Sequence, residues 1–329
     1  MQLRQLLPVC FKASWAALAL LCWVAAAPLA EAQVKPRKAP AKRATSILQP
    51  VTDLPAVRVK LFQAATLQNN FKDSEALAMY QEIISASPSH YLALWQAAVL
   101  SAKIGGRYSD ETRKSAYFDA ARQYADRSLA LQPEGGESNY AVALALFNQA
   151  TLYKAGARLR AFRDLRSHVY LAAERRPDLP EAWGLLGRWK YRVAHYNVVE
   201  RVYSKLALGG VPAGGNSREA IECLETARKL APLNLQFCHD LARMCRYQGR
   251  RQRAIEVLRD AEKTPPLTSE DLVISRLCRQ MLPPLVRADA RRQRRQQRLG
   301  QTPAVVNKEP SPGSTRVPAD ALLPRKDGK

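Results

Sequence analysis

The four histidines are the side chains of this sequence best suited to metal binding or proton transfer, and their spacing supports neither role. They lie 27 or more residues apart, at His90, His168, His195 and His239. A metal site or a catalytic pair on a helix needs a second histidine or cysteine about one turn away, and none of the four has one there. The sequence therefore predicts no metal site, no cofactor and no enzyme activity.

The glycine pairs are poorly placed for phosphate chemistry. Gly209-Gly210 and Gly214-Gly215 flank Pro212, a pattern that predicts a turn. A phosphate-binding loop needs a strand before it and a Lys-Ser or Lys-Thr pair after it, and the sequence shows neither here. We interpret this segment as a break between helices.

Cysteine chemistry is left open by the sequence. Four cysteines follow the N-terminal segment, at Cys223, Cys238, Cys245 and Cys278. Cys238 and Cys245 lie about 10 Å apart along one predicted helix, too far for a disulfide bond. Burial as small apolar side chains is the favoured interpretation. A bond between Cys223 and Cys238 is the alternative that an oxidising compartment would permit.

Lysine and arginine supply the remaining chemistry. The chain has 51 of them against 29 acidic residues, a net charge of +22. Such a charge favours an anionic partner: an acidic protein or peptide, anionic lipid head groups, or nucleic acid. Nucleic acid is the least favoured, because no nucleic-acid-binding motif is present. The cations are dispersed along the chain, so a merely solvated surface is the alternative.

Helix pairs that would position these cations repeat along the chain. Pro232 and Pro266 lie 34 residues apart, the period of the tetratricopeptide repeat. Small and apolar residues recur about one helical turn apart, at the same offsets before these prolines and before Pro88, Pro133 and Pro177. They are Ala76, Tyr80, Ile83, Ala121, Ala125, Ser128, Leu165, Val169, Ala172, Ala220, Leu224, Ala227, Ala254, Leu258 and Ala261. We predict an all-α fold, a tetratricopeptide-repeat solenoid of about five helix pairs with a capping helix, over residues 56–282.

The inner helix faces of such an array predict a partner-binding groove. Fixed positions of each first helix line the concave side. In the fourth and last units those positions carry Arg188, Tyr191, Arg192, His239, Arg243, Arg246 and Tyr247. Arginine binds carboxylates through paired hydrogen bonds, and tyrosine adds rigid contact area. We expect an acidic peptide or protein there; alternatively, the tyrosines brace the helix pair and the arginines face solvent.

Two helical segments follow the last repeat. Residues 268–281 predict the capping helix, with Thr268 or Ser269 as its N-cap. Its buried side is expected to carry Leu272, Leu277 and Met281. Pro283 and Pro284 should interrupt it, because proline lacks the backbone donor that a helix needs.

A basic helix is predicted over residues 283–299. It carries Arg287, Arg291, Arg292, Arg294, Arg295 and Arg298. A second functional hypothesis follows, that of a membrane-proximal adaptor whose arginine helix binds anionic lipid. Residues 300–329 contain too little to bury and are predicted to be disordered.

Residues 1–32 have the composition of a signal peptide. Arg4 and Lys12 precede an uncharged run, and Ala30-Glu31-Ala32 offers a cleavage site. The apolar run over residues 13–27 is 15 residues long, short of the roughly 20 that span a bilayer. We expect export to a periplasmic or extracellular location, with an uncleaved N-terminal anchor as the alternative. Residues 33–55 are predicted to be a basic, proline-rich linker.

An insertion interrupts the fourth unit. Residues 196–216 exceed the repeat length, residues 198–208 are compatible with a helix, and Gly209 begins a cluster of helix breakers. We predict an extension of the unit's first helix followed by a turn.

Three segments resemble a known family. They read Gly187-Arg188-Trp189-Lys190-Tyr191, Gly209-Gly210-Val211-Pro212 and Pro265-Pro266-Leu267-Thr268-Ser269-Glu270-Asp271. They are similar to the tetratricopeptide family of the regulator of microtubule dynamics proteins, in particular its exported bacterial relatives, over residues 62–282. The resemblance implies an all-helical scaffold without enzyme activity, with the 196–216 insertion as a family feature. For eukaryotic members it also implies association with microtubules and contacts between organelles.

Overall fold

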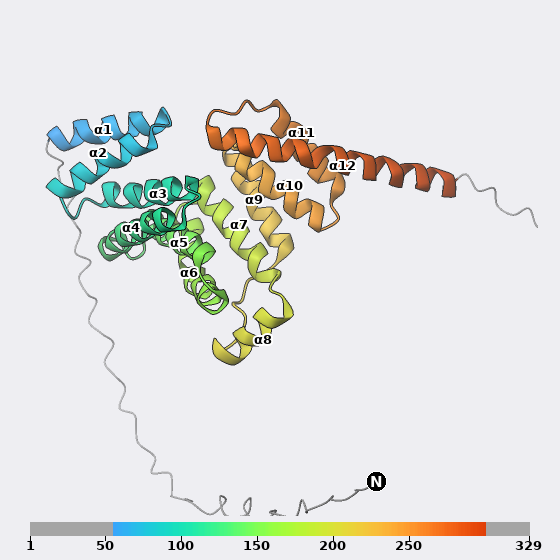
Figure 1. Ribbon diagram of the computed structural model, residues 1–329, viewed down its shortest axis with the longest axis horizontal. Coiled ribbons are helices and arrows are strands. Elements are labelled where there is room, and N and C mark those ends of the chain that lie inside the picture. Colours follow the sequence, from blue (N-terminus) through green and yellow to red (C-terminus); the bar gives the residue numbers. More distant parts are fainter. Residues whose placement is uncertain (1–54, 301–329) are drawn as a thin grey trace, which may run out of the picture. The chain divides into compact units, whose positions relative to one another are not determined.

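The computed structural model describes residues 55–300, with side chains for residues 55–298, and all regular structure among them is helical (Figure 1). The predictions made for the signal peptide, for the linker before Pro55 and for the tail beyond Gly300 lie outside the described residues.

Ten helices form five consecutive pairs, which confirms the repeat prediction. The first helices are α1 (Pro55–Asn69), α3 (Tyr91–Arg107), α5 (Gly136–Leu152), α7 (Pro180–Ala194) and α10 (Leu235–Tyr247). Their partners are α2 (Asp73–Ala86), α4 (Glu111–Leu131), α6 (Ala155–Arg175), α9 (Ser217–Leu230) and α11 (Arg251–Lys263). Each pair packs on the next, and α12 (Ser269–Gly300) covers the last pair. The short helix α8 (Val198–Ala207) lies between α7 and α9 in the sequence.

The recurring small and apolar positions form the core of this stack. All fifteen lie on the second helices, and each is no more than 2% exposed. The reason is steric: a helix that packs against both its hairpin partner and the next unit has room only for small or well-fitted side chains along its contact line. The sequence pattern therefore located the helix contacts correctly.

Gly187 shows how closely α7 and α9 approach each other. A Cβ atom at this position would lie 2.9 Å from the carbonyl oxygen of Ala220, a backbone atom that cannot rotate away. We expect Gly187→Ala to lower the free energy of unfolding by about 1–3 kcal/mol, the usual cost of overpacking. Urea denaturation of the variant measures this value.

Gly106, in α3, is the matched control for that variant, because a Cβ atom there meets no atom within 4 Å. Gly106→Ala should raise stability by about 0.5–1 kcal/mol, since alanine loses less backbone entropy than glycine in a helix. Equal changes for the two variants would show that α7 and α9 are not in close contact.

The prediction that Pro283 and Pro284 interrupt the C-terminal helix is wrong, because α12 runs through both prolines. The two residues that flank them, Leu282 and Leu285, are buried in the core that α10 and α11 share. Packing on both sides of the prolines holds the segment helical despite the lost backbone hydrogen bonds. The capping helix and the basic helix are therefore one element.

The start of α12 agrees with the sequence, but its buried face was predicted partly incorrectly. Thr268 Oγ1 accepts a hydrogen bond from the backbone of Asp271, at 3.0 Å, and caps the helix. Leu272 and Leu277 are exposed, Met281 is half-buried, and the buried positions include Cys278. Apolar residues occur on more than one side of this helix, so its periodicity does not decide which side packs.

The insertion forms a separate helix rather than an extension of α7. Helix α7 ends at Ala194, and Asn197 then begins α8 with a capping box. Its side chain accepts from the backbone of Glu200, and the Glu200 carboxylate accepts from the backbone of Asn197. This paired capping favours a new helix over continuation. The predicted turn is present, and Gly209 has a φ of 71°.

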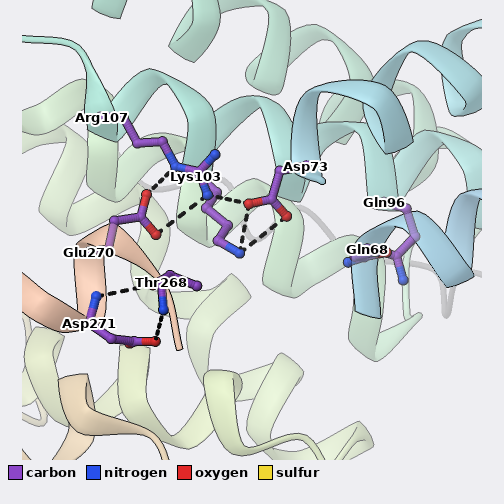
Figure 2. A network of polar contacts seen from close by, with 8 residues as sticks. All are labelled: Gln68, Asp73, Gln96, Lys103, Arg107, Thr268, Glu270 and Asp271. Atoms are coloured by element: carbon purple, nitrogen blue, oxygen red, sulfur yellow. Dashed lines mark hydrogen bonds and ion pairs between the residues drawn. The ribbon is translucent and has the colours of Figure 1, made fainter. Parts of the chain in front are cut away.

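A network of charges joins the beginning of the array to α12 (Figure 2). The fully buried Asp73 side chain pairs with Lys103, at 2.9 Å, and with Arg107 at the end of α3. Arg107 also pairs with Glu270, in the first turn of α12. Repeat stacking joins only neighbouring units, so this network is a contact that the repeat pattern does not contain.

Candidate functional site

A pocket of about 380 Å³ lies on the inner helices of the third, fourth and fifth units. Of the seven predicted groove residues, four line it: Arg188, Tyr191, Arg192 and Arg243. Three helices supply most of its wall, α5, α7 and α10, and these are the first helices of their units. Arg188 and Arg243, which are 55 positions apart in the sequence, thus line one pocket because both lie on first helices.

The other three predicted residues are on α10 but do not line this pocket. The His239 side chain is mostly buried beside Asp240, with 3.7 Å between Nδ1 and Oδ1. Arg246 and Tyr247 are exposed in the last turn of the helix.

Asp240 is the charged centre of the pocket. It is 4% exposed, and its carboxylate accepts from Arg188 Nε at 2.6 Å and from Gln236 Nε2 at 3.0 Å. Arg243 lies 3.7 Å away. Burial raises the pKa of Asp240, but the charge of Arg188, the hydrogen bond from Gln236 and the nearby His239 outweigh burial and hold that pKa well below its ordinary value. Asp240 is therefore ionised and fixes the guanidinium of Arg188.

Arg192 is held by a second buried carboxylate. Both of its terminal nitrogens donate to Glu200 of α8, and its guanidinium lies over the rings of Phe162 and Tyr196, at 5.7 and 4.9 Å. The hydrogen bonds from Arg192 lower the pKa of Glu200 despite burial. The two hydrogen bonds to Glu200 and the contacts with the two rings restrain the Arg192 side chain. Arg192 is therefore a fixed part of the pocket wall.

Aromatic and apolar side chains make up much of the remaining surface. Phe147 and Phe162 meet edge to face, with 5.6 Å between ring centroids. The Tyr191 ring packs on the His195 ring, with 4.0 Å between ring centroids, and His195 Nδ1 donates a hydrogen bond to the Tyr191 carbonyl oxygen. Met244 completes the apolar part. Such a surface is suited to an apolar side chain next to a charged one.

Arg243 is the pocket cation best placed to meet a partner. Its side chain is 47% exposed, against 27% for Arg188 and 30% for Arg192. It is also farther from its carboxylate than the other two are from theirs. The arrangement can bind a carboxylate at Arg243 while an adjacent apolar group packs on the phenylalanines.

Sequence reasoning missed six pocket residues, and the signal for some of them was present. Phe147 is on the first helix of the third unit, and Asp240 precedes the predicted Arg243 by three residues, so both lie on helices of the kind that the repeat rule covers. The others are Phe162, His195, Gln236 and Met244. Phe162 comes from a second helix, so the rule for first helices could not find it.

The histidines and cysteines within residues 55–300 form no second site. The four cysteines after residue 55 are free and buried, so Cys223 and Cys238 are not joined. Burial raises the pKa of Cys223 and of Cys245 to about 11, and that of Cys278 to about 12, which keeps these thiols protonated and unreactive. Within the described part of the chain, no three side chains are grouped to hold a metal ion. No helix described there is long and apolar enough to span a bilayer.

Five stacked helix pairs with a pocket on their inner helices define a tetratricopeptide-repeat protein. Residues 61–285 match the family model described as regulator of microtubule dynamics protein 1-3. The chain belongs to that family.

Two curated relatives carry the name regulator of microtubule dynamics protein 3. The mouse protein (Mus musculus) is 24% identical over 220 residues, which cover 65% of this chain and 46% of the mouse protein. The rat protein (Rattus norvegicus) is 25% identical over 179 residues, 54% of this chain and 38% of the rat protein. The chain thus spans less than half the length of each of these relatives.

A solved structure supports the fold. TTC0263, a thermophilic tetratricopeptide-repeat protein of Thermus thermophilus, superposes with a TM-score of 0.50 at 15% identity, and the match covers 68% of this chain and all of TTC0263. At this identity the likeness concerns the fold alone.

Proposed function

We propose that this chain is a non-enzymatic scaffold that binds an acidic segment of a protein or peptide in the pocket between α5, α7 and α10. Tetratricopeptide arrays are protein-interaction folds, because their stacked helices present one extended inner surface. The observation that supports an acidic partner is the presence of three arginines around an apolar floor. Two of them are fixed by buried carboxylates before any ligand arrives, which lowers the entropy lost on binding.

Arg243, the third of these arginines, is the residue whose substitution tests the proposal. Arg243→Ala should weaken binding of an acidic peptide about tenfold, because a hydrogen bond to a charged group contributes roughly 1.5–3 kcal/mol and each 1.4 kcal/mol is a factor of ten. The probes are fluorescent peptides that contain the same phenylalanine flanked by glutamates, by glutamines or by lysines. Fluorescence anisotropy gives the Kd of each.

Arg246→Ala is the matched control, since Arg246 is an exposed arginine on the same helix but outside the pocket. It should leave the Kd unchanged. Equal weakening by both variants would indicate a diffuse attraction to the basic surface. No preference for the glutamate peptide would contradict the proposal of an acidic partner.

Family membership favours a second candidate, an association with microtubules, because the relatives are named as regulators of their dynamics. Cosedimentation with stabilised microtubules tests it.

A location in the cell envelope is a further part of the proposal. It rests on residues 1–32, and detection of a mature N-terminus at Gln33 would support it. The alternative function is that of a membrane-proximal adaptor, in which the arginine-rich end of α12 binds anionic lipid. The arginines of this segment are exposed.

A further inference from the structure

Helix α8 turns its apolar side chains outward. Val198 and Val199 are each 76% exposed, Val202 is 50% exposed and Leu206 is 81% exposed. At 100° per residue these four positions fall on one side of the helix. Single exposed apolar residues are ordinary, but four together on a helix of ten residues mark an interaction surface.

The opposite side of α8 attaches it to the repeat array. Glu200 and Ser204 are buried there. Glu200 is the only acid of the helix, and it pairs with Arg192 and lies 3.9 Å from Arg158. The outward side of α8 therefore carries no negative charge, and the ion pairs of Glu200 attach the helix to α6 and α7.

Cations flank the apolar side. Arg201 and Lys205 are exposed on α8 itself. On the neighbouring helix α6, Arg163 and Arg166 are exposed near the turn that follows α8, where Arg166 donates to the carbonyl oxygen of Ala213. Asp164 is the one acid between these two arginines. With a net charge of +22, a second copy would be repelled from this surface, whereas an anionic surface would be attracted.

We propose that α8 is a membrane-docking element that places its four apolar side chains among the lipids of an anionic bilayer. Short helices of this kind lie in the plane of the interface, with apolar residues toward the acyl chains and cations at the head groups. Lys205 has the required position beside the apolar side, and the exposed Arg201 lies one turn before it, where its Nε donates to the carbonyl oxygen of Tyr196. This surface shares no residue with the lining of the peptide pocket, and Arg192 connects the two through Glu200.

The test measures binding of the full chain to sucrose-loaded vesicles by sedimentation. One set is made of phosphatidylcholine, and the other contains equal parts of phosphatidylcholine and phosphatidylglycerol. The variant carries Val199→Ser, Val202→Ser and Leu206→Ser. It should partition into the anionic vesicles about tenfold less than the unmodified chain, because three apolar side chains no longer leave water. Residues 1–54 are present in both chains, so any contribution from them cancels.

The matched control carries Leu230→Ser, Leu233→Ser and Leu267→Ser, three exposed leucines of other segments. It should partition like the unmodified chain. Both variants should keep the thermal melt of the unmodified chain; if the α8 variant does not, Lys205→Glu replaces it and should weaken binding to anionic vesicles only.

Three results would overturn the proposal. Unchanged partitioning of the α8 variant, with loss of binding when the arginines at 291, 292, 294 and 295 become serines, would assign the contact to α12. A loss of self-association by the α8 variant in the absence of vesicles would show that the surface binds a second copy. No preference of the unmodified chain for anionic vesicles would exclude the role of the cations.

Discussion

Replacing Arg188 with alanine is expected to lower the free energy of unfolding by about 3 kcal/mol at neutral pH, the lower end of the range for breaking a buried ion pair. The reason is Asp240, whose buried carboxylate would keep its charge but lose its closest cation. Gln236 and Arg243 remain near it, so the loss stays at the lower end. Chemical denaturation monitored by helical circular dichroism measures the change.

The loss of unfolding free energy caused by Arg188→Ala should become smaller in acid. In the unmodified chain the folded pKa of Asp240 is lowered, so Asp240 contributes stability above its unfolded pKa of about 3.9 and loses it as the pH falls through the folded pKa. Without Arg188, burial dominates and the folded pKa rises, so protonation stabilises the folded variant. A deficit that is constant from neutral pH to below about pH 4 would contradict this account.

A double variant separates the ion pair from simple packing. Arg188→Met combined with Asp240→Leu removes both charges and should recover most of the lost stability, because a buried pair can often be replaced by apolar residues of similar size. Arg246→Ala is the control for the loss of an exposed arginine and should change stability by less than about 0.5 kcal/mol.

Trp189→Ala is expected to lower the free energy of unfolding by about 3–5 kcal/mol, the range for deleting a large buried side chain. The indole is fully buried, donates to the carbonyl oxygen of Phe162 at 2.7 Å, and meets Tyr170 edge to face. It also lies close to Gly214 in the turn after α8. The variant should therefore loosen the insertion as well as the core, which faster hydrogen exchange in residues 208–216 would show.

Trp183, on the same helix, is the matched control. Its indole is only partly buried, and its nitrogen donates to the carbonyl oxygen of Pro177. Trp183→Ala removes the same atoms from a more solvent-exposed site and should lower the free energy of unfolding clearly less than Trp189→Ala does. Equal losses for the two tryptophans would mean that Trp189 is not enclosed as the structure has it.

The sequence predicted the helix pairs because their signal is local. Small and apolar residues one turn apart, such as Ala220, Leu224 and Ala227, must face a close neighbour wherever the chain folds, and all three are fully buried. The rule that places Arg188 and Arg243 on one inner surface is local too, because it counts positions within a single helix. Four of the seven predicted groove residues line the pocket for this reason.

What the sequence could not supply depends on contacts between helices. The side of α12 that packs was predicted incorrectly at Leu272 and Leu277, because apolar residues occur on several sides and only α10 and α11 select one. The break between α7 and α8 depends on Asn197 and Glu200, a capping pair within a segment whose composition is also compatible with one long helix.

By itself, then, the spacing of prolines and small residues determined that this protein is an array of helix pairs, and the positions of the arginines along the first helices predicted cations on the inner surface. Only the tertiary structure decided which of those cations are available to a partner. Arg188 and Arg192 are bound to Asp240 and Glu200, residues that lie 52 and 8 positions away, while Arg243 remains more exposed. Ion pairs depend on distances of a few ångströms between side chains of different helices, and only the folded chain sets those distances.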